Sequence, residues 1–409
     1  MKILWVVPFI PYPPNDGGRM RMYYLLKHLA KNHDISIFAP VINDSLTESE
    51  GVKEYCRYVY TAPYPVSPRI DTLNYLINSV QCWRAKPYIF YKFAPKNVRQ
   101  VFRDIIQQES FDIIEFVNMQ TTVFYNEIPG SSTPNRILTL FDVETDRIHS
   151  FFQVERNLAN KLGYYFQWLQ VKRYEFNILS QNKFSWIFNV SEKERNALTE
   201  RFPHLVDHIS LASNGVDCFG YDFAKSFDQN LKKQQLVFIG SMDYVVNQDA
   251  VLWFVQEILP HIHKKMPDVN FTIVGKNPPA SITALSSPNI TITGTVPDVR
   301  PYLQQATAVV VPLRAGGGTR LKILEAMAAG VPVVSTTKGA EGLAVEHGKH
   351  LLLTDSPVDF ASQTVALLQN VGLQQQLTKA GRTLVEDRYD WSKIAEHVDE
   401  IYQQIAASN

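Results

Sequence analysis

An apolar run, three glycines and an apolar helical pattern follow one another between residues 308 and 328. Residues 308–312 (AVVVP) have the composition of a buried strand. Apolar residues then recur at helical spacing, at Leu321, Leu324 and Ala328. A strand that turns directly into a helix is one unit of a parallel sheet, so this segment points to an α/β protein.

The same alternation of strands and helices runs through both halves of the chain. In the first half we predict a helix from Gly17, a long helical stretch over 144–180, and strands at 2–7, 34–38, 112–116, 136–140 and 184–190. In the second half we predict helices over 248–264 and 358–406, and strands at 236–240, 270–274, 289–293, 308–312 and 331–335. The predicted fold class is α/β, with two Rossmann-like halves in series.

A turn signal at Asn214-Gly215-Val216-Asp217, followed by a polar stretch over 225–235, marks the boundary between the halves. We expect an N-terminal domain over 1–213, a linker over 214–235 and a C-terminal domain over 236–388. The helical segment 389–409 is expected to cross back to the N-terminal domain.

Charge and cysteine content exclude several classes of protein. Among 409 residues, 40 are Lys or Arg and 40 are Asp or Glu, a balance that argues against a general nucleic-acid binder. The three cysteines (Cys56, Cys82 and Cys218) form no Cys-x-x-Cys pair, so neither a disulfide framework nor a zinc site is predicted. A reducing compartment, the cytoplasm, is expected.

No apolar run reaches the roughly 18 residues that a membrane span needs. Residues 2–7 are followed by prolines and Asp16 and are interpreted as a first strand rather than a signal peptide.

Residues 53–103 are both basic and aromatic. They contain nine Lys or Arg against two acidic residues, a net charge of 9 − 2 = +7. Such a composition suits contact with the inner face of an anionic membrane. A solvated face over an ordinary core is the alternative interpretation.

The glycine-rich turn also has a definite binding chemistry. A turn that leads into a helix presents free backbone N–H groups and the positive end of the helix dipole. Arg320 and Lys322 add positive charge, and Glu325 lies one turn further along the helix. This set suits a ligand with two phosphates and a sugar that bears hydroxyl groups.

Other glycine turns compete for this role, at Gly17-Gly18 and at Gly240-Ser241. The Gly-x-Gly-x-x-Gly fingerprint and the P-loop pattern are both missing from the sequence, which argues against an NAD enzyme and a P-loop nucleotidase.

The stretch 312–335, PLRAGGGTRLKILEAMAAGVPVVS, resembles the retaining glycosyltransferases of family 4, which have the GT-B fold. Segments 13–19, 190–192, 213–217 and 294–302 agree with that family in order and spacing. Residues 237–253 resemble a subgroup of sugar transferases associated with polysaccharide synthesis. The resemblance is strong over 236–335 and weaker over 40–135, where acceptor specificity would lie.

The resemblance implies two domains with parallel sheets facing each other across a cleft, and a nucleotide-sugar donor held mainly by the C-terminal domain. Glu325 would accept hydrogen bonds from the ribose; a surface ion pair with Lys322 is the alternative. The expected diphosphate contacts come from Gly316, Gly317, Gly318, Thr319, Arg320, Lys322 and Arg314. Further donor contacts are expected from Gly17, Gly18, Gly240, Ser241 and Asn247.

The sequence departs from the family pattern at three places. Gly317 stands where the first of two glutamates is usual, which affects the choice of sugar. Gly240-Ser241-Met242-Asp243 and Asn247 stand where many members carry a phosphate-binding arginine and lysine. Residues 136–140 lead into Phe141-Asp142-Val143-Glu144 where many members carry a histidine, and His149 is too distant to replace it.

Asp142 is therefore the leading candidate for a catalytic group, with Glu144 second. A carboxylate there could position the acceptor hydroxyl or take its proton. Capping of the following helix by Asp142 is an equal alternative. No metal or other cofactor is expected.

The function predicted is transfer of a sugar from a nucleoside diphosphate sugar, with UDP favoured over GDP, to a hydroxyl of a sugar, lipid-linked or small-molecule acceptor. Retention of configuration and a place in glycan, polysaccharide or glycolipid synthesis follow from the resemblance. A sugar-nucleotide epimerase and a non-catalytic nucleotide-binding scaffold remain as alternatives.

Overall fold

A computed structural model describes residues 1–42, 46–64, 74–75, 77–79, 81, 83–130, 134–155, 157–223, 234–316 and 320–407. The chain divides into two compact units. The N-terminal unit comprises residues 1–213 together with 395–409, and the C-terminal unit comprises residues 214–394.

The N-terminal unit is built on a seven-stranded sheet in which every neighbouring pair is parallel, in the order β3-β2-β1-β4-β5-β6-β7. Continuous burial of β4 and of most of β1 and β2 fits a sheet that is covered on both faces. The strands are β1 (Lys2–Val6), β2 (Asp34–Val41), β3 (Val59–Pro63), β4 (Ile113–Val117), β5 (Asn135–Leu140), β6 (Trp186–Asn189) and β7 (Ile209–Leu211).

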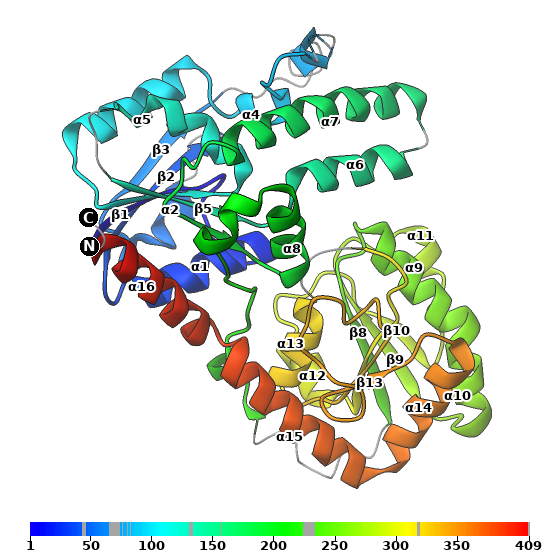
Figure 1. The fold of residues 1–409 in the computed structure, drawn as a ribbon. Coiled ribbons are helices and arrows are strands. Elements are labelled where there is room, and N and C mark those ends of the chain that lie inside the picture. The colour runs from blue at the N-terminus through cyan, green and yellow to red at the C-terminus, as the bar shows by residue number, and fades with distance from the viewer. Residues whose placement is uncertain are drawn as a thin grey trace. The chain divides into compact units, whose positions relative to one another are not determined.

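Helices α6 and α7 form a hairpin in the N-terminal unit, and they lie side by side along their length (Figure 1). The Asn157 side chain caps α7 by accepting hydrogen bonds from the N–H groups of Ala159 and Asn160. The helices are α1 (Gly17–Leu29), α2 (Leu46–Glu50), α4 (Tyr88–Tyr91), α5 (Lys96–Gln108), α6 (Glu144–Val154), α7 (Leu158–Leu179) and α8 (Glu192–Arg201).

The C-terminal unit has a six-stranded parallel sheet in the order β10-β9-β8-β11-β12-β13. Its centre is β8 beside β11, whose four residues are all buried. The strands are β8 (Gln235–Ile239), β9 (Asn270–Val274), β10 (Ile290–Ile292), β11 (Ala308–Val311), β12 (Val333–Ser335) and β13 (Leu352–Leu353).

The last helix, α16 (Trp391–Ala407), belongs to the N-terminal unit from Ala395 onward. There the Tyr402 hydroxyl donates to the buried Glu115 carboxylate of β4 and accepts from the Trp5 indole at 3.3 Å. The helices of the C-terminal unit are α9 (Val245–Trp253), α10 (Leu259–Lys265), α11 (Ala280–Thr283), α12 (Arg300–Gln305), α13 (Leu321–Ala328), α14 (Pro357–Gln369) and α15 (Val371–Arg388).

The predicted fold class is confirmed, because both units are α/β with all-parallel sheets. The single helical stretch expected over 144–180 is wrong: α6 ends at Val154 and α7 begins at Leu158. No helix in the described part of the chain has the length and apolar character to cross a bilayer. Cys56 and Cys218 are free thiols, and Cys82 lies outside the described residues.

Candidate active site

The carboxyl end of β8 forms a close turn in the C-terminal unit. A Cβ on Gly275 would lie 1.9 Å from the Gly240 carbonyl oxygen. Only glycine therefore fits at position 275, where the chain after β9 passes this turn. The Asn247 side chain of α9 donates a hydrogen bond to the Ser241 carbonyl at 2.7 Å. Asn247 therefore fixes the turn and leaves its amide oxygen for another partner.

That partner is Lys322, in the first turn of α13. Its ammonium group donates to the Asn247 amide oxygen at 2.9 Å and lies 4.2 Å from the centre of the Phe238 ring. A Cβ on Gly240 would lie only 2.9 Å from the same ammonium group. Burial lowers the pKa of Lys322 to about 7, and nearby Arg320 acts in the same direction. The cation thus lies directly over the Gly240 turn.

Glu325 follows one turn later on α13. Burial raises the pKa of its carboxyl to about 7, while Lys322 and a hydrogen bond from the Tyr221 side chain oppose that shift. Tyr221 was not singled out by the sequence analysis. Because Lys322 bonds to Asn247, the two charged side chains of α13 each have a separate partner.

The other two cations of the glycine-rich segment are engaged differently. Arg320 is buried and donates to the Gly316 and Lys338 carbonyls at 2.9 and 3.2 Å, so it ties the turn to the chain after β12. Arg314 forms a two-bond ion pair with Asp249 and stacks over Trp253 at 5.2 Å. Gly316 has a φ of +101°, whereas Gly317, Gly318 and Thr319 lie outside the described residues.

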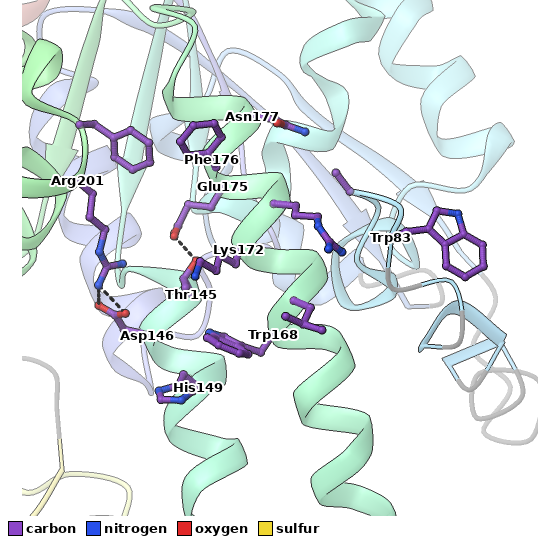
Figure 2. A pocket seen from close by; sticks show the side chains of 14 residues that line it. Trp83, Thr145, Asp146, His149, Trp168, Lys172, Glu175, Phe176, Asn177 and Arg201 are labelled. Carbon is purple, nitrogen blue, oxygen red and sulfur yellow. Dashed lines mark hydrogen bonds and ion pairs between the residues drawn. The ribbon is translucent and has the colours of Figure 1, made fainter.

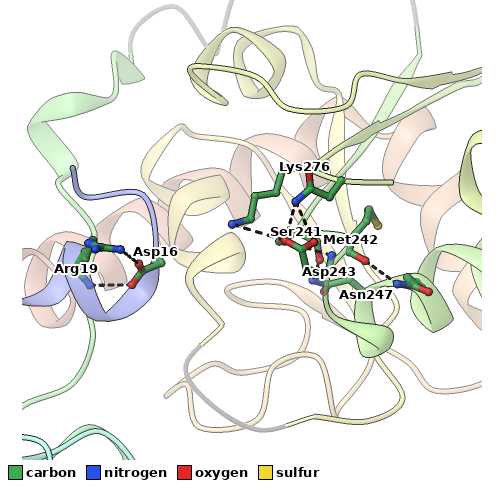
Figure 3. A network of polar contacts seen from close by, with 9 residues as sticks. Asp16, Arg19, Ser241, Met242, Asp243, Asn247 and Lys276 are labelled. Carbon is green, nitrogen blue, oxygen red and sulfur yellow. Dashed lines mark hydrogen bonds and ion pairs between the residues drawn. The ribbon is translucent and has the colours of Figure 1, made fainter. Parts of the chain in front are cut away.

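Ser241 and its neighbours form a second polar group beside the turn (Figure 3). The Ser241 hydroxyl donates to Asp243 at 3.0 Å, and the Asn277 amide donates to both oxygens of the same carboxylate. The hydrogen bonds from Asn277 and Ser241, together with the nearby Lys276, hold the pKa of Asp243 below its usual value.

In the N-terminal unit, Gly17 and Gly18 form the first turn of α1. Asp16 caps this helix by accepting from the Arg19 N–H, and its other oxygen pairs with the Arg19 side chain (Figure 3). A Cβ on Gly18 would lie 3.4 Å from the rings of Phe9 and Phe141, in ordinary contact. Gly18 is thus beside the residue that precedes Asp142.

Asp142 and Glu144 differ in their surroundings. Glu144 is buried and its carboxylate pairs with Arg147 at 2.6–2.8 Å. Asp142 is half-buried, and burial raises the pKa of its carboxyl, an effect that Arg147 opposes. Helix α6 starts after Val143 without a side-chain cap, so the capping alternative for Asp142 is wrong.

At the start of α6, Glu175 of α7 is the hydrogen-bond acceptor instead. Its carboxylate accepts from the Glu144 N–H at 3.0 Å and from the Thr145 hydroxyl. Burial raises the pKa of Glu175 to about 7, and the same cause raises that of Glu194 to about 7 with Asp142 contributing. Sequence reasoning missed both residues, because only tertiary packing brings them toward α6.

A cavity of about 840 Å³ lies against the α6–α7 hairpin (Figure 2). Its aromatic lining includes Trp83, His149, Trp168 and Phe176. Arg201, also in the lining, holds the Asp146 carboxylate with two hydrogen bonds at 2.7 and 2.8 Å.

Comparison with known proteins matches residues 233–370 to the family described as "Glycosyl transferases group 1". A phosphatidyl-myo-inositol mannosyltransferase of Mycobacterium tuberculosis is 28% identical over 207 residues, which are 48% of this chain and 54% of that protein. Residues 233–370 are therefore similar to group 1 glycosyltransferases. The matched region contains Gly240, Asn247, Lys322 and Glu325.

Two further similarities extend over nearly the whole chain. An uncharacterized 44.6 kDa protein in the cps region of Klebsiella pneumoniae is 24% identical, covering 96% of this chain and 97% of the relative. The structure of Anabaena Alr3699/HepE in complex with UDP-glucose superposes with a TM-score of 0.67 at 14% identity, over 99% and 100% of the two chains. The fold is therefore of the GT-B type, as expected.

Proposed function

We propose that this glycosyltransferase moves a sugar from a UDP-sugar to a hydroxyl group of its acceptor, with retention of configuration. The observation that carries the donor half of the proposal is the Lys322 ammonium group over the Gly240 turn, 2.9 Å from the Asn247 amide oxygen. In a parallel sheet, ligands bind at the carboxyl ends of the strands, and β8 and β11 are central strands here.

Lys322 takes over the charge that an arginine and a lysine after β8 supply in many family members. Since burial lowers its pKa to about 7, part of the population carries no charge before the donor arrives. If a diphosphate oxygen replaces the Asn247 amide oxygen as the partner of Lys322, its negative charge would favour the protonated form of the lysine. Lys322 would then take up a proton when the donor binds. Asn247 holds both Lys322 and the Ser241 carbonyl, and it acts as a positioning residue.

Glu325 binds the ribose hydroxyls, and Tyr221 orients its carboxylate. Arg320 keeps the glycine-rich turn in place through two carbonyls rather than through the ligand. The complex of HepE with UDP-glucose supports UDP as the nucleotide.

The reaction breaks the bond between the anomeric carbon and the diphosphate oxygen and forms a bond to the acceptor oxygen on the same face. The negative charge that develops on the leaving diphosphate is stabilised by Lys322 and by the N–H groups that begin α13. Asp142, half-buried after β5, positions the acceptor hydroxyl, whose proton passes to the departing phosphate.

The N-terminal unit supplies the acceptor site in this account. The resemblance of residues 237–253 to polysaccharide-associated sugar transferases supports a role in glycan assembly. The Klebsiella relative from the cps region supports the same placement.

Calorimetric titration with UDP, GDP and ADP tests the donor assignment. We expect UDP to bind most tightly, and absence of binding by all three at millimolar concentration would remove the proposed site. Incubation with UDP-sugars and hydroxyl acceptors should then release UDP and yield a new glycoside. Conversion of the donor into an isomeric UDP-sugar without release of UDP would identify an epimerase instead.

A further inference from the structure

One face of α7 carries apolar side chains that are left exposed. Leu158, Leu162, Tyr165 and Phe176 follow one another at spacings of four, three and eleven residues, which place them on a single helix face. Their exposed fractions are 78%, 58%, 37% and 57%. Leu169, at the same register between Tyr165 and Phe176, is half-buried. These five residues are here called the outer stripe.

The opposite face of α7 is already packed. Val171, Tyr174 and Ile178 are buried in the core of the N-terminal unit, and Gly163 is buried near the Tyr75 ring. From Leu158 to Phe166, Gly163 is the one buried residue among those that the structure describes. A helix with apolar residues all round requires partners on both faces, so the outer stripe calls for a second surface.

Helix α6 adds to this exposed surface and stiffens it. The rings of Phe151 and Tyr164 lie 5.8 Å apart, and His149 and Trp168 lie 4.8 Å apart. These pairs join the two helices outside the sheet core, and Phe151 remains 39% exposed. These ring contacts hold the two helices together, and the helices lie side by side in Figure 1.

The charges around the outer stripe are mainly positive. Lys172 is exposed and lies 5.4 Å from the Trp168 ring, and exposed Arg173 follows it. Lys161 lies 5.4 Å from the Phe152 ring near the hairpin tip. The carboxylates nearby have partners or are buried: Arg201 binds Asp146, Glu155 at the tip accepts from the Asn157 N–H at 2.8 Å, and Glu175 is buried.

The stripe leads into the cavity beside the hairpin. Leu169, Lys172, Arg173 and Phe176 of α7 line it, and Trp83 lines it from another segment (Figure 2). An apolar and aromatic surface thus runs from the tip at Leu158 to a cavity with cations at its wall.

We propose that the α6–α7 hairpin docks this protein on an anionic lipid bilayer. Leucine and aromatic side chains of the stripe enter the headgroup layer, and Lys161, Lys172 and Arg173 contact lipid phosphates. A coiled-coil pairing with α7 of a second copy fits less well. Lys172 stands at the register position between Leu169 and Phe176, and aromatic residues occupy positions where a coiled-coil seam carries Leu or Ile.

This docking surface differs from residues 53–103, the segment whose composition suggested membrane contact. Within 53–103, Arg57 pairs with Asp34 at 3.3 Å, and Arg99 and Arg103 both pair with Glu127. Residues 65–73, 76, 80 and 82 of that segment lie outside the described residues.

Flotation of the full-length protein with vesicles tests the proposal. We expect it to float with vesicles that contain phosphatidylglycerol, and to bind phosphatidylcholine vesicles at least tenfold more weakly, because these carry no net negative charge to attract the cations of the hairpin. Equal binding to both vesicles, or binding to neither, would overturn the proposal.

The decisive variant is the pair Leu158→Gln with Leu162→Gln, which should weaken vesicle binding at least tenfold because two exposed leucines are lost. Val358→Gln with Val371→Gln, two exposed aliphatic residues on helices of the C-terminal unit, is the matched control and should bind vesicles normally.

Both double variants should keep the wild-type unfolding midpoint and UDP affinity, which separates a docking defect from misfolding or a failed donor site. Normal vesicle binding by the leucine variant would exclude the hairpin as the docking element. Concentration-dependent self-association that the leucine variant abolishes would assign the stripe to a second copy instead.

Discussion

The two units have the same type of sheet but opposite chemistry beyond the ends of their strands. In the N-terminal unit, four carboxylates (Asp142, Glu144, Glu175 and Glu194) have raised pKa values, mainly because of burial. In the C-terminal unit, the half-buried cation Lys322 lies over the Gly240 turn with a lowered pKa. The carboxylates of the N-terminal unit can position a hydroxyl group, and the cation of the C-terminal unit can bind an anion.

This difference shows that the fold alone does not determine the site. In both units a parallel strand leads through a short turn into a helix, which is where ligands bind in such folds. Asp142 and Glu144 follow β5, whereas Asn247 follows β8 and Lys322 follows β11, beside the carboxylates Asp243 and Glu325. The proposed roles of acceptor unit and donor unit rest on those residues.

The largest effect is expected at Asp142. Asp142→Asn should lower turnover by roughly 10²–10⁴-fold while UDP affinity stays within about twofold, because the carboxylate acts on the acceptor. Steady-state kinetics and calorimetry on one preparation measure both quantities. Asp146→Asn, at an exposed position in the first turn of α6, is the control. Normal turnover in the Asp142 variant would remove the acidic role of the N-terminal unit.

The next effect concerns the ribose contact. Glu325→Gln should weaken UDP binding by roughly 10–100-fold, because two charge-assisted hydrogen bonds become neutral ones. Glu341→Gln, on the loop after β12 in the same unit, should leave the affinity unchanged. Unchanged UDP affinity in Glu325→Gln would show that this side chain only packs against Tyr221.

A smaller effect is expected at Tyr221. Tyr221→Phe removes the hydroxyl that donates to Glu325 and leaves the ring in place. UDP affinity should fall by roughly three- to tenfold, which corresponds to one hydrogen bond. A loss as large as that of Glu325→Gln would mean that Tyr221 contacts the nucleotide itself.

The last effect concerns stability rather than binding or turnover. Glu175 has a pKa of about 7 in the folded protein against an ordinary value of 4.5, so the folded state holds more protons between those values. The free energy of unfolding of the N-terminal unit should therefore fall as pH rises from about 4.5 to 7, by on the order of 2 kcal/mol for this group.

In Glu175→Gln the free energy of unfolding should depend less on pH. Chemical denaturation at several pH values measures this dependence. Exposed Glu200→Gln is the control and should leave the pH profile as it is. A slope that is unchanged in the Glu175 variant would place the pH dependence elsewhere.

The central strands could be predicted from sequence because parallel strands buried on both faces appear as continuous apolar runs, as in 308–311. The edge strand β13 has two residues and β7 has three, too few to show a pattern. The break between α6 and α7 was missed because apolar residues continue on both sides of it.

Within the site, the strand-to-helix turns and the candidates Lys322 and Glu325 could be identified in advance. Which of Arg320 and Lys322 faces the turn after β8 could not, because the rotation of α13 is set by its packing. Tyr221 and Glu175 lie 104 and 31 residues from Glu325 and Glu144 in sequence, so no local spacing marks them.

The central claim is that Lys322 is the cation of an anion-binding C-terminal unit. UDP titration by calorimetry near pH 7.5, in buffers of different ionisation enthalpy, tests it most directly. We predict net proton uptake on binding, and loss of both this uptake and about 10–100-fold in affinity in Lys322→Gln but not in Lys276→Gln. Unchanged affinity and proton uptake in Lys322→Gln would contradict the account.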